Sequence, residues 1–243
     1  MSRQRNGPAE MYTVRDLPDP IDPARLDLLA RAEPATIGHV RHAGFMDTGI
    51  RGILPDVRIA GTAVTVRCPG ADCTIIHYAL GQIRPGDVLV IDRCGDHRHA
   101  ATGGAVAYAA RKAGARGIVL DGVVSDLGEL RQFGLPVWAR GASVVTTKHL
   151  DLGGEFCTEV SCGGVGVRPG DAILADENGV LVLDPADIEA AANQAICMQE
   201  AEKSLFARLD RGEKLPDISG ATQRVLARLR TNRTHGSPAP TFE

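Results

Sequence analysis

The sequence predicts a mixed α/β protein, and three observations support that prediction. Short runs of Val, Ile and Leu are typical of buried strands, and the Ala-rich and capped segments between them are typical of helices. Aromatic residues make up only 4% of the 243 residues, so the core must be built from aliphatic side chains. Pro-Gly turns separate several of the apolar runs. The length suffices for one domain with a substantial core and peripheral segments.

The first half of the chain is expected to alternate helices and strands. Residues 1–20 are polar and predict an N-terminal arm. Asp22 before Pro23 predicts a capped helix that ends at Pro34, and Asp72 predicts the cap of a second helix. A Gly-rich loop is expected after Pro34. The further elements predicted here are strands over 61–68, 88–92, 117–120 and 137–139, and helices over 72–80, 100–113 (closed by Gly114) and 125–133.

The second half is expected to be mostly strand, followed by one long helix. Strands are predicted over 165–167, 172–175 and 180–183, and Asp184-Pro185 predicts the start of the helix. Apolar residues recur along that helix at helical spacing, namely Ile188, Ala192, Ala195, Ile196, Leu205, Phe206 and Leu209. These limits predict a single α/β domain over 21–212 and a polar C-terminal tail over 213–243.

Two short segments are alike, Arg84-Pro85-Gly86-Asp87 and Arg168-Pro169-Gly170-Asp171. Each precedes an apolar run that ends in Asp. Pro followed by Gly suits the second and third positions of a type II turn. The alternative is an ancient duplication within two packed sheets. A likeness of only four residues is thin evidence for a duplication, so we favour the turn explanation.

Composition excludes several function classes. The net charge of −3 and the pI of about 6.2 give no global basic character, which argues against nucleic-acid binding. No apolar run reaches the roughly 18 residues of a membrane span, and the N-terminus has no apolar signal core. We therefore expect a cytoplasmic protein whose six cysteines are free thiols. Neither C-x4-C pair has the C-x2-C spacing of a zinc site.

The stretch from His97 to Leu130 contains the candidate site. Gly103-Gly104 stands at the start of a predicted helix, where unpaired N–H groups and the helix dipole favour a carboxylate or phosphate. Close packing is an equal alternative explanation for these glycines. Asp126 and Glu129 are three residues apart and would share one helix face. They suit Mg²⁺ or Mn²⁺, or else they form a helix cap without metal.

The spacing of these residues resembles a known family. The pattern Gly, 20 residues, Arg-Asp, two residues, Glu or Asp is similar to that of the 4-hydroxy-4-methyl-2-oxoglutarate aldolases and the related regulators of ribonuclease activity. Here Gly104, Ser125, Asp126 and Glu129 occupy it, with Ser125 in place of Arg. The similarity extends over residues 61–183.

The resemblance implies a fold and a site. It implies an α/β/β/α sandwich of the swivelling-domain-like type, assembled as a homotrimer or homohexamer with the active site between subunits. Asp126, with Glu129, would hold Mg²⁺ or Mn²⁺, largely through water. The backbone amides of residues 103–106 (Gly103, Gly104, Ala105 and Val106) would bind the carboxylate of a small 2-oxo acid, and the metal would stabilise a pyruvate enolate during aldol cleavage or oxaloacetate decarboxylation.

Ser125 departs from this pattern, because the family's arginine would contact the substrate through a charge-assisted hydrogen bond. Three explanations remain open. Another cation replaces it, with Arg98 the first candidate and Arg131 the second; or the substrate differs; or the chain is no longer an aldolase.

Histidines nearby leave further alternatives open. His97 or His99 could be a general base or metal ligand, although a solvated loop explains them as well. His77 points into the site or simply packs, and the sequence does not place His149.

Two functions therefore compete. The first is a metal-dependent carbon–carbon lyase that acts on a small 2-oxo acid. The second is a non-catalytic regulator that binds a ribonuclease or another protein partner. Asp126 and Glu129 favour the lyase, and Ser125 favours loss of the usual reaction.

Overall fold

The computed structural model describes residues 11–234 and shows a mixed α/β protein. It has two compact units, whose boundary lies between Ile196 and Cys197. The first ten residues of the predicted arm, and the predicted tail beyond residue 234, lie outside the described residues. The domain limits predicted at residues 21 and 212 stay a prediction.

A mixed sheet forms the centre of the first unit. The strands of the described residues are β1 (Tyr12–Val14), β2 (Arg51–Gly52), β3 (Ile59–Arg67), β4 (Asp87–Asp92), β5 (Gly117–Asp121), β6 (Val123–Val124), β7 (Val137–Ala139), β8 (Gly141–Ala142), β9 (Gly154–Phe156), β10 (Val160–Cys162), β11 (Val165–Val167), β12 (Ala172–Asp176) and β13 (Gly179–Leu183). β6 with β8, and β10 with β11, form two separate two-stranded sheets, and the other strands form the mixed sheet. β3, β4, β5 and β7 are parallel neighbours. β3 pairs antiparallel with β12 along its first half and with β9 at its end.

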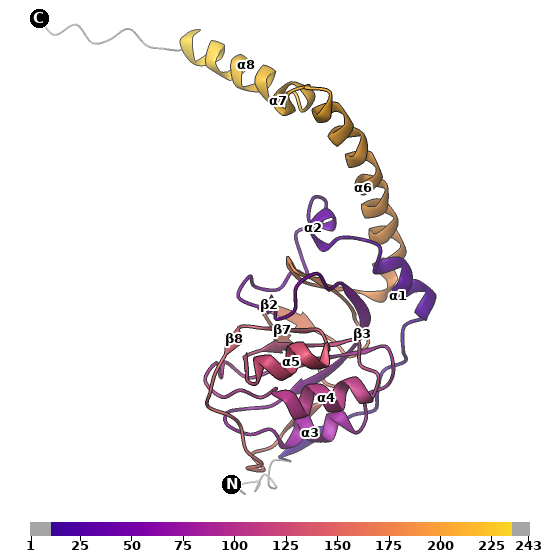
Figure 1. The fold of residues 1–243 in the computed structure, drawn as a ribbon, viewed down its shortest axis with the longest axis vertical. Helices are drawn as coiled ribbons and strands as arrows, with labels where there is room; N and C mark the ends of the chain where they lie inside the picture. The colour runs from indigo at the N-terminus through magenta and orange to yellow at the C-terminus, as the bar shows by residue number, and fades with distance from the viewer. Residues whose placement is uncertain (1–10, 235–243) are drawn as a thin grey trace, which may run out of the picture. The chain divides into compact units, whose positions relative to one another are not determined.

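Eight α-helices accompany the strands among the described residues. They are α1 (Pro23–Leu29), α2 (Pro34–Ile37), α3 (Thr74–Leu80), α4 (Gly104–Lys112), α5 (Leu127–Phe133), α6 (Ile188–Asp210), α7 (Leu215–Ile218) and α8 (Ala221–Thr234), with a 3-10 turn at Pro185–Asp187 before α6. Figure 1 shows α3, α4 and α5 gathered on one face of the sheet.

The apolar side chains form three buried clusters, and each cluster lies between two layers of secondary structure. Three clusters therefore separate four layers. In β4, Leu89 and Ile91 face α3, α4 and α5, while Val88 and Val90 face the opposite way, against β10–β13. The outer face of β12 and β13 packs in turn against α1, α2 and the start of α6. The layer order is helices, strands, strands, helices, which confirms the predicted α/β/β/α sandwich.

Three predicted helix ends are confirmed by their caps, whereas Pro34, predicted to end the first helix, instead begins α2, and the N-cap of α3 is Cys73 and not Asp72. The Asp22 and Asp184 side chains accept the N–H groups two residues further on, as helix caps do. Gly114 follows α4 with φ +88°, a left-handed value that favours glycine. These short-range signals work because the partners lie within one turn of each other.

The predicted Pro-Gly turns are also confirmed. In both 84–87 and 168–171 the Asp side chain accepts the N–H of the Arg at 2.8 Å. Gly86 and Gly170 have φ of +95° and +90°, as the third position of a type II turn requires. Turn geometry thus accounts for the likeness of the two segments.

Other elements differ from the expectation because pairing across the chain forms them. The helix predicted over 100–113 begins only at Gly104. Ala100 instead lies in a bridge with Thr146, since tertiary pairing overrides a local alanine preference. The sequence also gave no signal for the two- and three-residue strands β1, β2, β8, β9 and β10, which exist through their partners.

The second unit contains the end of α6 together with α7 and α8. In α6, Ile188, Ala192 and Ala195 are buried as predicted, whereas Phe206 is 53% exposed. The predicted apolar stripe therefore marks a buried face only in the first part of the helix. Within residues 11–234 no helix combines the length and apolar character that crossing a bilayer would require.

Asp72 is a fully buried carboxylate that joins the start of α3 to the loop 148–152. One oxygen accepts the Thr74 hydroxyl at 2.7 Å and the N–H groups of Thr74 and Leu150, both at 3.0 Å. The other accepts the Leu152 N–H at 2.8 Å. Burial acts to raise the pKa of Asp72, but the hydrogen bonds from Thr74, Leu150 and Leu152 outweigh it and hold that pKa well below its usual range.

Asp72→Asn is expected to lower the free energy of unfolding at neutral pH by about 2–4 kcal/mol, because an amide group would meet buried N–H donors. The pKa of Asp72 in the folded protein lies below its usual value of 3.8. The stabilisation is therefore complete above pH 3.8, and it is lost as the pH falls from there through the folded-state pKa. Urea unfolding should show a constant gap between wild type and variant down to about pH 5, narrowing below about pH 4. Asp56→Asn, at an exposed position, is the control and should leave stability unchanged. A gap independent of pH would contradict this role for Asp72.

Candidate functional site

A cleft of about 260 Å³ lies between the first turns of α3 and α4, the turn before α5 and the loop 146–149. Five residues singled out by the sequence line it: Gly103, Ala105, Val106, Ser125 and Asp126. The turn before α5 reaches the start of α4 because Ser125 donates its N–H to the carbonyl of Thr102 at 2.9 Å. The structure thus gathers the predicted glycines and the predicted Asp at one place.

The carboxylate of Asp126 is turned away from its own helix. Its backbone is left-handed, with φ +56° and ψ +42°, and its side chain makes no capping hydrogen bond to α5. Such a conformation costs about 1 kcal/mol or more in a residue with a side chain. One oxygen instead accepts the Gly104 N–H at 3.0 Å and the Ser125 hydroxyl at 3.1 Å. The helix-cap alternative for Asp126 is therefore wrong, because this carboxylate serves the start of α4.

Side chains lie directly against both glycines. A Cβ atom at Gly103 would lie 2.3 Å from an Asp126 carboxylate oxygen and 2.6 Å from the Ser125 hydroxyl. A Cβ atom at Gly104 would lie 1.5 Å from a Glu129 carboxylate oxygen. Close packing, one of the two explanations for this pair, is thus observed directly. The anion site stays a prediction.

The start of α4 retains donors for a ligand. Gly104 donates its N–H to Asp126, but Ala105 and Val106 follow in the first turn, where N–H groups have no intrahelical acceptor. Both line the cleft, and Ala105 is exposed. Two backbone donors with the positive end of the helix dipole can therefore meet an anion beside Asp126.

Of the opposite wall, the sequence offered only His77, as one of two alternatives, and the structure places it at the cleft. Cys73, just before α3, and His77, the fourth residue of α3, line this wall. Lys148 and His149 line it from the loop before β9. The two imidazole rings are 4.5 Å apart between centroids and nearly perpendicular. Burial, and then the nearby His149, lower the pKa of His77. The four-residue spacing of Cys73 and His77 was a usable helical signal; Lys148 and His149 had none.

The candidate replacement cations lie elsewhere. Arg98 and Arg131 are exposed, and neither is among the residues that line the cleft. His99 is held 2.7 Å from the Asp96 carboxylate, and His97 is exposed. Lys148 is the cation that the structure brings to the cleft. The assignment of Arg98 to the substrate stays a prediction without support from this geometry.

The acidic ends of the parallel strands serve the fold. Asp121, at the end of β5, pairs with Arg140 and accepts the Gly163 N–H at 2.7 Å. Asp92, at the end of β4, pairs with Arg67 at 3.2 Å. These carboxylates have cationic partners within the fold, whereas Asp126 has none among the described residues, which favours Asp126 as the candidate.

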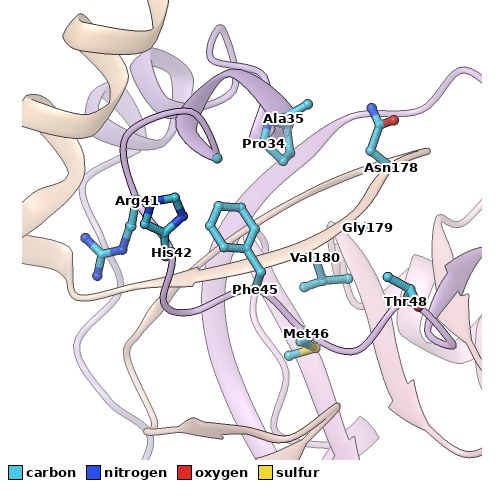
Figure 2. A pocket seen from close by; sticks show the side chains of 11 residues that line it. Pro34, Ala35, Arg41, His42, Phe45, Met46, Thr48, Asn178, Gly179 and Val180 are labelled. Atoms are coloured by element: carbon cyan, nitrogen blue, oxygen red, sulfur yellow. The ribbon is translucent and has the colours of Figure 1, made fainter. Parts of the chain in front are cut away.

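A larger cavity of about 360 Å³ lies beside α2 and β13. Figure 2 shows Phe45 between the helix that carries Pro34 and the strand that carries Val180. Arg41 at its edge donates to the Asp187 carboxylate at 2.9 Å, so its charge is engaged. The walls are mainly apolar, whereas a reaction site needs converging polar groups. The smaller cleft is therefore the better candidate.

Asp126 is suited to a hard divalent cation. One of its oxygens holds Gly104 and Ser125, and within residues 11–234 its other oxygen accepts no hydrogen bond. Mg²⁺ is commonly bound by one or two carboxylates, with water and substrate completing the shell. The exposed carboxylate of Glu129 stands next to Gly104. The donor set thus fits the predicted Mg²⁺ or Mn²⁺, with few protein ligands.

This sandwich and cleft define a protein class. Residues 34–182, more than half of the chain, match the RraA-like family, described as Aldolase/RraA. The chain belongs to that family, as the sequence resemblance predicted.

Two relatives show the extent of the sequence similarity. A Halalkalibacterium halodurans protein, provisionally named a 4-hydroxy-4-methyl-2-oxoglutarate aldolase, is 33% identical over 57% of this chain and 65% of its own length. The chain thus spans slightly under two thirds of that relative. An uncharacterised Methanocaldococcus jannaschii protein is 31% identical over 70% of this chain and 82% of its own.

Solved structures show the same fold. The RNA-processing inhibitor RraA from Thermus thermophilis has a TM-score of 0.54 at 31% identity, covering 58% of this chain and 84% of that one. A Streptomyces coelicolor member of the RNase ES inhibitor RraA family has a TM-score of 0.68 at 24% identity, covering 80% and 98%. The second likeness supports the fold alone.

The contact between Gly104 and Glu129 predicts that the loss of stability in Gly104→Ala depends on the Glu129 side chain. Gly104→Ala is expected to destabilise the protein by about 1–3 kcal/mol, since the new methyl group displaces Glu129. In a Glu129→Ala background the penalty should shrink, because only the 3.1 Å contact to the Glu129 Cβ remains and alanine favours helix by about 1 kcal/mol. Urea unfolding of the four proteins in this double-mutant cycle measures the coupling. Equal effects in both backgrounds would show that the contact is unimportant.

Proposed function

We propose that the protein is a divalent-metal-dependent carbon–carbon lyase, an aldolase or decarboxylase, that acts on a small 2-oxo acid. The observation that carries this proposal is the left-handed Asp126, whose carboxylate is turned into the cleft instead of capping α5. Strained residues of this kind are concentrated at functional sites. The names of the aldolase-type relatives support the same reaction class.

The start of α4 would bind and orient the substrate. The N–H groups of Ala105 and Val106 would hold the carboxylate next to the 2-oxo group, with the helix dipole adding to the attraction. Gly103 permits close approach of a ligand to the backbone, because no Cβ stands between the cleft and Asp126. Fixing the substrate against a rigid helix start places the bond to be broken near Asp126.

Asp126, with Glu129 beside it, would hold the Mg²⁺ or Mn²⁺ ion. When bound, the ion would supply Lewis-acid polarisation of the 2-oxo group. The Ser125 hydroxyl and the Gly104 N–H fix the Asp126 carboxylate, so its orientation does not depend on the ligand. Ser125 would thus act as a positioning residue for Asp126, whereas an arginine at position 125 would contact the substrate.

Lys148 is the candidate for the missing positive charge. It lines the cleft from the loop 146–149, and it is exposed enough to move toward a bound anion. A flexible ammonium group on an exposed loop gives a weaker and less directional contact than a guanidinium. We therefore expect that the second polar group of the substrate, beyond its 2-oxo acid end, is one that does not need a bidentate arginine contact.

A homo-oligomer, trimer or hexamer, would complete the site. The loop that lines the cleft exposes apolar side chains on either side of it: Val144 is 97% exposed, Leu150 44% and Leu152 53%. Apolar side chains gathered in this way are typical of an interface. A neighbouring copy seated there would lie next to Lys148 and His149.

The second candidate function is that of a protein-binding regulator. Ser125 in place of the family's arginine and the likeness to the Thermus RNA-processing inhibitor favour it. Its signature would be inhibition of a purified endoribonuclease that persists in EDTA and in Asp126→Asn.

The lyase proposal is tested by pyruvate release from oxaloacetate and from 4-hydroxy-4-methyl-2-oxoglutarate, with Mg²⁺ and with EDTA. Asp126→Asn is expected to lower kcat/KM at least about 100-fold, because the amide keeps the left-handed backbone but loses the charge. Asp56→Asn is the matched control, since Asp56 is also left-handed (φ +55°) and exposed. Ser125→Arg should raise the rate with 4-hydroxy-4-methyl-2-oxoglutarate. Absence of metal-dependent turnover in wild type and in Ser125→Arg would refute the lyase proposal.

The oligomer proposal predicts that the double variant Val144→Asp, Leu152→Asp has a lower molar mass than wild type in light scattering after gel filtration. Charges on both sides of the loop would have to be buried at the interface, which is costly. Leu229→Asp makes the same change at a 53% exposed position on α8 and should keep the wild-type mass. A monomeric wild type, or equal masses for wild type and the double variant, would contradict this interface.

A further inference from the structure

One wall of the cleft carries three soft ligand atoms that the proposed lyase chemistry does not use. The Cys73 sulfur, one ring nitrogen of His77 and one of His149 all lie within 4.8 Å of one another. The Cys73 sulfur is 3.9 Å from His149 Nδ1. Cys73 is buried, whereas both histidines are exposed, so an ion could enter from solvent. Asp126 is not part of this cluster.

These separations are close to those of a tetrahedral zinc site. With Zn–S of about 2.3 Å and Zn–N of about 2.0–2.1 Å, ligand atoms stand about 3.3–3.6 Å apart. The observed 3.9 Å between Cys73 and His149 is within a few tenths of an ångström of that range. Both histidines are exposed, so their side chains are free of tight packing that would oppose a shift toward a bound ion.

The backbone around the cluster is already fixed. Cys73 and His77 are four residues apart, so they face the same side of α3. The Cys73 N–H donates to the carbonyl of Lys148 at 3.0 Å, directly before His149. The buried Asp72 carboxylate binds the Cys73 N–H at 2.8 Å and the Leu150 N–H at 3.0 Å. One anchor therefore holds both segments that supply ligands, which favours binding over a chance approach.

We infer that Cys73, His77 and His149 form a binding site for a soft divalent transition metal, Zn²⁺ in particular. A thiolate and two imidazoles select zinc over magnesium, because Mg²⁺ prefers oxygen ligands. Three protein ligands leave the fourth position of a tetrahedral ion for water or substrate, the arrangement of catalytic zinc sites. The three ligand residues line the same cleft as Ala105 and Asp126, so a small ligand in the cleft would be close to the ion.

This site is independent of the proposed hard-metal site. The hard ligands are oxygens of Asp126, just before α5, and of Glu129 on α5, whereas the soft ligands come from the start of α3 and the loop before β9. The cleft would therefore present two cation sites of different chemistry to one small anionic ligand. Zinc binding would hold even if the lyase proposal failed.

The test is Zn²⁺ binding to the full chain, reduced and stripped with a chelator, by competition with a chromogenic zinc indicator. We expect one Zn²⁺ per chain, retained in excess Mg²⁺. Cys73→Ser, His77→Gln and His149→Gln should each lower the affinity at least about 100-fold, since loss of a direct ligand exceeds the effect of its supporting partners. Cys94→Ser and His97→Gln are matched controls, because both side chains are exposed and outside the cleft.

Co²⁺ supplies a second measurement on the same proteins. A tetrahedral Co²⁺ complex with a thiolate gives intense visible bands and a sulfur charge-transfer band in the near ultraviolet. The charge-transfer band should vanish in Cys73→Ser and persist in Cys94→Ser. Because His149 is on an exposed loop, His149→Gln retains the test if Cys73→Ser fails to fold.

The outcomes separate the two proposals. Asp126→Asn should bind Zn²⁺ like wild type while losing Mg²⁺-dependent turnover. The inference is overturned if wild type retains no Zn²⁺, if Cys73→Ser and His149→Gln bind it as tightly as wild type, or if the Co²⁺ spectrum shows no thiolate band.

Discussion

The buried carboxylate of Asp72 is the interaction on which the cleft depends. It accepts hydrogen bonds from the start of α3 and from the loop before β9, two segments more than 70 residues apart in the sequence. Left unpaired, a charge at a fully buried position would be costly, so the two segments must stay together for the fold to be stable. One wall of the cleft therefore exists because a carboxylate in the core has to be satisfied.

The other wall depends on a second carboxylate with the opposite property. Asp126 adopts a left-handed backbone and reaches across to the Gly104 N–H, and its free oxygen stays open to solvent. The absence of a Cβ at Gly103 and Gly104 lets Asp126, Ser125 and Glu129 lie against the start of α4. The fold thus holds one carboxylate satisfied in the core and another available in the cleft, and the available one is suited to a cation and its substrate.

The two walls offer different chemistry to one small ligand. Oxygen ligands and backbone N–H groups come from α4 and the turn before α5, and sulfur and nitrogen ligands come from α3 and the loop before β9. Family membership is compatible with catalysis and with regulation, because names of both kinds occur among the relatives. Ser125 is the residue at which this chain leaves the catalytic pattern. Lys148 is the cation among the residues that line the same cleft.

The sequence by itself determined the elements whose signals are local. Asp22, Asp184 and the two Pro-Gly turns act within a few residues, and these predictions are confirmed. The α/β/β/α class was implied by the family resemblance, and the packing of the layers confirms it. Tertiary structure alone decided the rest. The direction of the Asp126 carboxylate was open between cap and cleft until the start of α4 was placed beside it. His149 meets Cys73 because the Asp72 carboxylate and the Lys148 carbonyl join the two segments, and contacts between distant segments leave no spacing signal in one sequence.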